Sequence, residues 1–230
     1  CNLDLGNTGL PGCSDNAKVL RKAFVFEQFD SEGNENKYAI TDAIDEAFLT
    51  ARLNDPDKSK RWYPLPILDN VQQVRADDTV ESTELGDNFF VQEGTNTVTA
   101  EAWETPEIYE GRFNTFLCPK LAFVGVDTGG NILANGSEAG FWKGLPIAKN
   151  TFRARKADAT ATSVKKTLFS WTYARTVGDG DIGIISASDI TADLLNANGL
   201  LDVISSNETA TSTTEITVDL NTLFGSLLDP

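Results

Sequence analysis

Residues 79–103, TVESTELGDNFFVQEGTNTVTAEAW, predict the element around which this chain is organised. The segment is rich in Thr, Val and Phe and contains no Pro, a composition that favours β-strands. Gly86-Asp87-Asn88 interrupts it as a tight turn, and Gly94 allows a bulge or a second bend. We therefore expect a long hairpin or a three-stranded meander.

The first strand of this hairpin has few apolar residues on either face. Thr79, Glu81 and Thr83 share one face, and the residues between them share the other. Neither face can form a dry core, and an isolated two-stranded ribbon in water does not offset its ordering entropy. The pairing must then be completed elsewhere, and a neighbouring copy of the same chain is one candidate.

The composition is that of a soluble globular protein. The chain has 230 residues, of which 40% are hydrophobic and 23% charged. This length suits one large β domain, or one domain with an appendage. No apolar run approaches the length of a membrane span, so we expect no membrane crossing.

The charge is strongly acidic, with 19 Lys and Arg against 34 Asp and Glu and a formal net charge of -15. Such a balance argues against a wrapped nucleic acid, because phosphates would be repelled. It is compatible with a wall that nucleic acid slides past without sticking. The simplest interpretation is that an acidic surface keeps an abundant protein soluble.

The residue inventory speaks against catalysis and metal binding. Histidine is absent, which removes the usual general base and the commonest metal ligand. The three cysteines form no metal-spaced cluster, although Cys1 and Cys13 could pair if the chain were exported. Asp179-Gly180-Asp181, with Asp189 nearby, lacks EF-hand spacing, so an exposed turn is favoured over a calcium site. Phosphate loops and dinucleotide fingerprints are also absent, and we predict no enzyme activity, cofactor or metal.

The order of elements suggests three parts. Residues 1–16 are dominated by Gly, Asn, Pro and Asp and predict an irregular arm that becomes ordered against a partner. Residues 17–204 predict the β domain. Residues 205–230 predict a polar linker, Ser205–Thr214, followed by a tail strand, Glu215–Leu220, that docks by edge pairing.

Apolar runs predict the core strands of the β domain. They lie at residues 18–30, 120–133, 141–152 and 164–173, and Tyr38-Ala39-Ile40 is predicted to return from a turn at 30–34. Two similar hairpins, around Phe24 and Phe123, indicate a weak internal repeat or chance reuse of one turn.

Two short helices are predicted beside these strands. Asp42, with Asp45 three residues on, offers an N-cap for a helix that reaches Leu53. Ser186 and Asp189 have capping-box spacing for a second helix that closes at Gly199. The fold class expected is therefore mainly β, a β-sandwich or barrel-like domain with a long hairpin and two short helices.

Residues 58–71, KSKRWYPLPILDNV, form the one basic, aromatic and proline-rich patch. Trp62 or Tyr63 could stack on nucleic-acid bases beside these cations. A loop that packs its aromatic side chains under the first helix, or against a neighbouring subunit, is favoured because the chain as a whole is acidic.

This layout resembles the tail tube proteins of long-tailed bacteriophages. The likeness covers residues 1–205: an irregular arm, a strand, a helix, a polar loop, the long hairpin, and the late helix SASDI…LLNANGLLDV. The resemblance implies that six copies form a ring around a β-barrel lumen, and that rings stack into a β-tube. Genome DNA would pass through this tube without specific binding, and an acidic lining would lower friction.

The resemblance also implies a place and partners for the chain. It would act in the virion tail after synthesis in the host cytoplasm, with other tail proteins as further partners. Sister copies would meet through the hairpin and through contacts between rings. The expected inter-subunit hairpin residues are Thr79, Glu81, Thr83, Phe89, Phe90, Val91, Thr97, Thr99 and Trp103; the expected inter-ring residues are Leu3, Leu5, Leu10, Trp62 and Tyr63.

A different interpretation is a secreted or lipid-anchored fimbrial subunit or surface lipoprotein. Cys1 would be acylated, and the tail strand would be donated to the next subunit. Cys1 in the first position has two explanations, namely removal of an initiator Met or cleavage of a signal peptide before a lipidated cysteine. Capsid decoration remains a further alternative, and an enzyme or sugar-binding jelly roll is a third.

Overall fold

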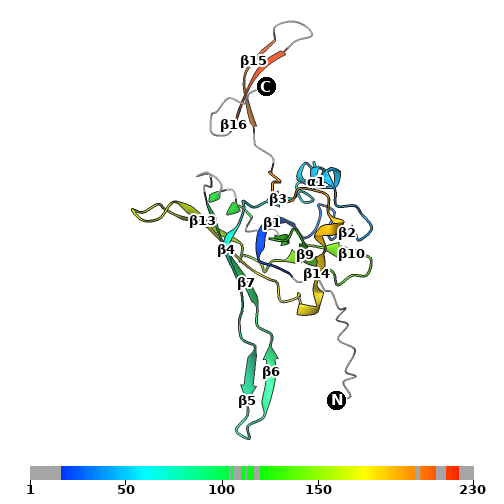
Figure 1. Ribbon diagram of the computed structural model, residues 1–230, viewed down its shortest axis with the longest axis vertical. Coiled ribbons are helices and arrows are strands. Elements are labelled where there is room, and N and C mark those ends of the chain that lie inside the picture. The colour runs from blue at the N-terminus through cyan, green and yellow to red at the C-terminus, as the bar shows by residue number, and fades with distance from the viewer. Residues whose placement is uncertain are drawn as a thin grey trace. The chain divides into compact units, whose positions relative to one another are not determined.

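The computed structural model describes residues 17–103, 105, 110–111, 113–116 and 120–199, together with the backbone of 203–210 and 216–222. The chain divides into two compact units between Ala197 and Asn198. The first unit is built from several antiparallel sheets (Figure 1), which confirms the prediction of a mainly β fold. The described strands close no barrel within the chain.

The larger sheet of the first unit has eight strands, all paired antiparallel. Six of them follow the order β2-β10-β9-β8-β1-β3, while β11 pairs with β8 and β14 with β9. Their bounds are β1 Leu20–Glu27, β2 Lys37–Ala39, β3 Tyr63–Pro64, β8 Leu121–Asp127, β9 Ile132–Asn135, β10 Phe141–Lys143, β11 Leu145–Pro146 and β14 Ile182–Ile185.

Strands β1 and β8 form the centre of this sheet because both are buried on both faces. Ala23 and Val25 contribute to one core cluster, and Phe24 and Phe26 contribute to another on the opposite face. The near-continuous apolar runs of these strands reflect this double burial. Both strands and the β8–β9 hairpin were predicted correctly.

A second sheet, of four strands, covers one face of the first. Its order is β12-β13-β7-β4, and Phe169 and Trp171 of β13 pack against the larger sheet, with the rings of Phe123 and Trp171 5.3 Å apart. The polar segment of β4 was not predicted as a strand. The bounds are β4 Asp69–Arg75, β7 Asn96–Trp103, β12 Arg153–Ala157 and β13 Lys166–Thr172.

The opposite face of the larger sheet is covered by α1, Glu46–Leu53, and by a cluster of aromatic side chains. The predicted cap is one turn too early. Asp45, not Asp42, is the N-cap, because its carboxylate accepts a 2.8 Å hydrogen bond from the Phe48 amide. The helix ends at the predicted residue.

Trp62 belongs to this second core. It is 1% exposed, its ring stacks on Phe26 at 5.5 Å, and its indole N–H donates to the Tyr38 hydroxyl at 2.8 Å. Trp62 was expected to contact a neighbouring ring of subunits. The structure speaks against this expectation, because almost none of the side chain is exposed. Instead, Trp62 packs under α1, which was the other interpretation considered for this segment.

The predicted second helix is wrong. Ser186 caps only a short 3-10 helix, Ala187–Asp189, and residues 190–199 are not helical. Their carbonyls are used elsewhere, because the Lys22 ammonium donates to the carbonyls of Leu195 at 2.7 Å and Ala197 at 2.6 Å. Two Asn and a Gly in LLNANG also lower helix propensity.

The predicted return of Tyr38-Ala39-Ile40 onto the first strand is also wrong in its partner. The turn at 30–34 forms, with the Asp30 carboxylate accepting from the amides of Glu32 and Asn34. Strand β2 then pairs with β10, in register Trp142 opposite Tyr38, instead of with β1.

The second unit contains an antiparallel hairpin of β15, Val203–Ala210, and β16, Ile216–Thr222. The last strand was predicted. The predicted polar linker, Ser205–Thr214, is wrong in its first part, because Ser205–Ala210 lies in β15 and pairs with β16.

We predict a pH-dependent stability from Lys22. Burial lowers the pKa of its ammonium to about 8 from an ordinary 10.5, against the opposing effect of Asp193. Between these values the unfolded chain binds more protons at this position than the folded chain, so this contribution to the free energy of unfolding rises with pH.

Urea unfolding of the wild type and of Lys22→Met at pH 7, 8, 9 and 10 measures this contribution. The stability difference, wild type minus variant, should increase between about pH 8 and pH 10. A difference that is independent of pH would contradict the assignment, since other groups cancel in the comparison.

Candidate assembly site

Two strands form a ribbon that extends away from the four-stranded sheet. Strands β5, Thr79–Ser82, and β6, Asn88–Gln92, continue from β4 and β7 and pair only with each other among the described strands (Figure 1). We call residues 79–92 the arm. Its turn is closed by the Thr83 amide, which donates to the Asp87 carbonyl at 2.8 Å, and Gly86 adopts φ 87°.

The arm carries five large apolar side chains that are exposed to solvent. The register places Val80 opposite Phe90, and both lie on one face, while Phe89 and Val91 lie on the other. Their exposed fractions are 50% to 63%, and Leu85 in the turn is 92% exposed. Exposed apolar side chains gathered on both faces of a ribbon are typical of a segment that is covered by a partner.

This finding extends the expectation for the hairpin, which was drawn from the faces of its first strand. The first strand, β5, is mainly polar on both faces. The second strand, β6, supplies the apolar side chains Phe89, Phe90 and Val91. Among the predicted residues, Thr79, Glu81, Thr83, Phe89, Phe90 and Val91 do lie on the arm. Val80 and Leu85 were not among them, although an apolar residue beside a Gly turn is a detectable signal.

The three other predicted hairpin residues lie in β7, which is an interior strand. Thr97, Thr99 and Trp103 are paired with β13 on one side, and β7 is also paired with β4 on the other. Their backbone groups are therefore not free to pair with a sister copy, and any contact with one would have to be made by their side chains. The side chains of Thr99 and Trp103 remain exposed.

The remaining predicted contacts fall elsewhere. Tyr63 is half-buried in β3, where its ring lies 5.0 Å from that of Phe116. Leu3, Leu5 and Leu10 lie outside the described residues.

The root of the arm is fixed by a close approach of two backbone segments. The Ala76 amide donates to the Thr95 carbonyl at 3.1 Å, and the Gly94 amide donates to the Asp78 carboxylate at 2.8 Å. A β-carbon on Gly94 would lie 1.7 Å from the Ala76 carbonyl oxygen, so only glycine fits here. Gly94 is thus required by the close approach of the two backbone segments at the root of the arm.

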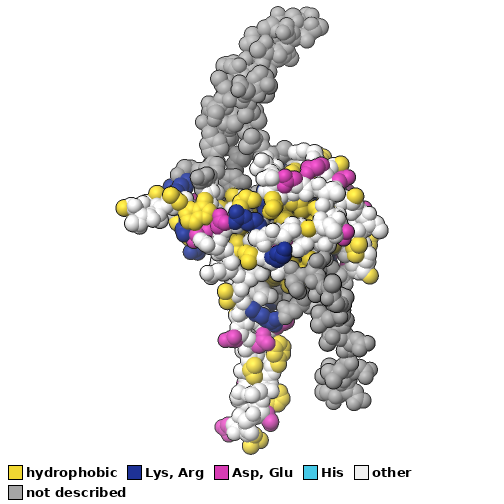
Figure 2. Space-filling model, in the orientation of Figure 1, with side chains coloured by type: hydrophobic (Ala, Val, Ile, Leu, Met, Phe, Trp, Pro, Cys, Tyr) yellow, Lys and Arg dark blue, Asp and Glu magenta, His cyan; other side chains and the backbone are white. Residues whose placement is uncertain are grey.

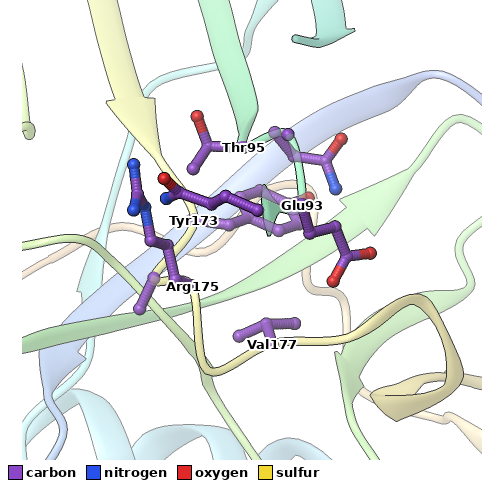
Figure 3. A pocket seen from close by; sticks show the side chains of 9 residues that line it. Glu93, Thr95, Tyr173, Arg175 and Val177 are labelled. Carbon is purple, nitrogen blue, oxygen red and sulfur yellow. The ribbon is translucent and has the colours of Figure 1, made fainter. Parts of the chain in front are cut away.

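Ion pairs and a buried tyrosine hold the sheet beneath this root. Arg75 pairs with Glu93 at 2.5 Å and with Asp78 at 3.7 Å. A hollow of about 130 Å³ lies here, lined by residues 92–96, 173–175 and 177. Figure 3 shows the side chains that line it. Beside it the Tyr173 hydroxyl accepts from the Gln73 amide at 2.9 Å, and burial raises the pKa of Tyr173.

The described residues offer little else that resembles a chemical site. No three His, Cys, Asp or Glu side chains among them lie close enough together to hold a metal ion. None of the helices in the part of the chain that the structure describes is long and apolar enough to cross a membrane.

Comparison with known proteins does not identify a family. No family model matches the chain, and no curated protein matches it. Function must therefore be inferred from the arm and the sheet that bears it.

We predict that Gly94→Ala displaces the root of the arm. Because the obstacle is a backbone carbonyl and not a movable side chain, the free energy of unfolding should fall by about 2 kcal/mol. Chymotrypsin should also cut faster at Phe89 and Phe90. Gly180→Ala, where a β-carbon would meet nothing within 4 Å, is the control. Equal stability and cleavage in both variants would refute the packing at the root.

Proposed function

We propose that this protein is a structural subunit that assembles with copies of itself into stacked rings, as the wall of a tail tube. The observation that carries the proposal is the arm, a two-stranded ribbon with exposed apolar side chains on both faces. Such a ribbon is marginal in water and becomes stable when a neighbour covers it. Sister copies supply such a neighbour without a further gene product.

The four-stranded sheet supports the ring within this proposal. Its strands alternate in direction, so its two edge strands, β12 and β4, run in opposite directions. A copy placed head to tail therefore continues the antiparallel pattern, and a rotation that closes gives a ring. Six copies of four strands would make a barrel of 24 strands, wide enough for an aqueous channel.

One edge of this sheet is partly covered in the isolated chain. The side-chain amide of Asn114 donates to the Ala154 carbonyl at 3.0 Å and accepts from the Ala154 amide at 3.2 Å. It thus imitates a neighbouring strand at one residue of β12 and protects this edge from premature pairing. In the proposed ring the next copy displaces Asn114 from Ala154.

The face that would line the proposed lumen carries basic as well as acidic side chains. The outward face of the four-stranded sheet carries Arg153 and Arg155, because the intervening Ala154 points into the core. On the same face Lys166 pairs with Glu101 at 2.5 Å. Passing DNA would therefore meet weak, salt-sensitive contacts to a few cations, and the acidic surplus of the chain lies elsewhere.

Two observations bear on the competing interpretations. The late helix that contributed to the resemblance is absent, so the proposal rests on the arm and the sheet. Donation of the last strand to another fimbrial subunit would require β16 to leave β15, with which it is paired. The ring is favoured because it leaves every described strand in place.

We predict that Phe89→Ser combined with Phe90→Ser prevents assembly without unfolding the chain. Both side chains are exposed, so the stability of the monomer should change by less than about 0.5 kcal/mol. Loss of two buried rings in the assembly should raise the concentration required at least about a hundredfold.

Sedimentation velocity and negative-stain microscopy measure this effect. The wild type should form rings or hollow tubes as its concentration rises. Ile40→Ser combined with Ile184→Ser removes two exposed apolar side chains elsewhere and should assemble normally. A wild type that stays monomeric when concentrated, or assembly unaffected by the Phe substitutions, would contradict the proposal.

We also predict that Asn114→Ala shortens the lag before assembly. The variant has no amide to displace from β12, and each such hydrogen bond contributes about 1 kcal/mol. Light scattering after dilution from urea follows the lag. An unchanged or longer lag would exclude β12 as an assembling edge.

A further inference from the structure

Much of the surface that Figure 2 shows is white, which marks the backbone and neutral polar side chains. Asparagine recurs in this group along the sequence and is chemically labile, because its side-chain amide can be lost. The loss is fastest where glycine follows, because a residue without a β-carbon leaves its main-chain nitrogen unhindered. The chain contains this dipeptide twice, at Asn135-Gly136 and at Asn198-Gly199. The two copies have very different surroundings.

The first copy, Asn135-Gly136, is held by the larger sheet. Asn135 is 5% exposed, and its side-chain oxygen accepts from the Ser137 amide at 3.0 Å and from the Ser137 hydroxyl at 2.7 Å. The Gly136 amide donates to the Asp181 carbonyl at 2.8 Å. A reaction between these two groups requires that all three hydrogen bonds break and that this end of β9 opens.

The second copy, Asn198-Gly199, lacks these restraints. Both residues are exposed and lie outside any helix or strand. Among the described residues, the Asn198 side chain has no hydrogen-bond partner, and the Gly199 amide donates to none. The nucleophile and the carbonyl carbon that it attacks are therefore both accessible in the folded chain.

Asn196 provides an internal comparison two residues earlier. It is also exposed, but Ala197 follows it, and its side-chain amide donates to the Asp193 carboxylate at 2.7 Å. Exposure alone therefore does not distinguish Asn198 from its neighbour. The following glycine and the lack of a partner among the described residues do.

We propose that Asn198 is a site of spontaneous deamidation in the folded protein and that Asn135 is protected from it. The Gly199 nitrogen attacks the side-chain carbonyl carbon of Asn198 and forms a five-membered imide. The bond from that carbon to the side-chain nitrogen breaks, and ammonia leaves with the proton of the Gly199 amide. Water then adds to either carbonyl of the imide and opens the ring.

The two directions of ring opening give two products. One is Asp at position 198, in which a carboxylate replaces a neutral amide. The other is isoaspartate, which also adds a methylene to the main chain between Ala197 and β15. Direct hydrolysis of the side-chain amide would give Asp alone, so the appearance of isoaspartate identifies the imide route. This inference goes beyond the proposed function and does not depend on assembly.

Peptide mapping of the full chain measures both sites in one sample after incubation at neutral and mildly alkaline pH. Trypsin releases them on separate peptides, because Lys120 and Lys143 bound the first, whereas no Lys or Arg follows Arg175 in the sequence. Asn198 should deamidate at least about a hundredfold faster than Asn135, since no hydrogen bonds to described residues must first be broken. Its rate should rise with pH, because the attacking nitrogen must lose its proton.

Two controls separate the chemistry of the dipeptide from its structure. Gly199→Ala should slow the reaction at Asn198 at least about tenfold, because the new β-carbon hinders attack. Gly180→Ala, on the same tryptic peptide and with open space for a β-carbon, should leave the rate unchanged. In guanidinium chloride both Asn-Gly sites should react at similar rates, since only the sequence then acts.

Three outcomes would overturn the assignment. They are equal rates at the two sites in the folded protein, no reaction at Asn198 under conditions in which the unfolded chain reacts, and a product that contains Asp without isoaspartate. Preferential reaction at Asn198 that gives both products supports it.

Discussion

The central constraint in this structure is the arm, a two-stranded ribbon whose apolar side chains are not buried by the rest of its own chain. Val80, Leu85, Phe89, Phe90 and Val91 lie on the arm at 50% exposure or more. Burial of a large apolar side chain is worth about 2 kcal/mol, so five such side chains represent a considerable driving force for association. A free two-stranded sheet cannot supply this burial for itself. The proposed assembly rests on this constraint rather than on any sequence motif.

The rest of the first unit provides a rigid base for that ribbon. Strands β1 and β8 are buried on both faces, and the four-stranded sheet packs against them through Phe169 and Trp171. Strand β7 connects the arm to this base, because it follows the arm in the chain and is paired with β13 and β4 in the four-stranded sheet. A force on the arm is therefore transmitted to a hydrogen-bonded sheet and not to a loop.

Sequence reasoning succeeded where burial follows local pattern. The runs that became β1, β8 and β13 are apolar or alternating, and Asn54-Asp55-Pro56 stops α1 by local chemistry. Sequence reasoning failed where a contact with residues distant in the sequence determines the local structure. Strand β4 is a strand because β7 pairs with it, since its own residues are polar. The segment after Asp189 is not helical because Lys22, far away in sequence, binds two of its carbonyls.

The candidate site was half predictable for the same reason. The turn at Gly86 and the apolar residues of β6 are visible in the sequence, but the assignment of β7 to the interior depends on partners from β4 and β13. The clash that makes Gly94 obligatory depends on Ala76, which lies across the root of the arm.

Hydrogen–deuterium exchange of the amides in residues 88–92, in dilute and in assembled protein, tests the central claim most directly. The account predicts fast exchange in the dilute monomer and at least about a hundredfold slower exchange after assembly, because neighbouring copies then cover the arm. Exchange in the monomer as slow as that of β8, or no added protection in the assembly, would contradict it.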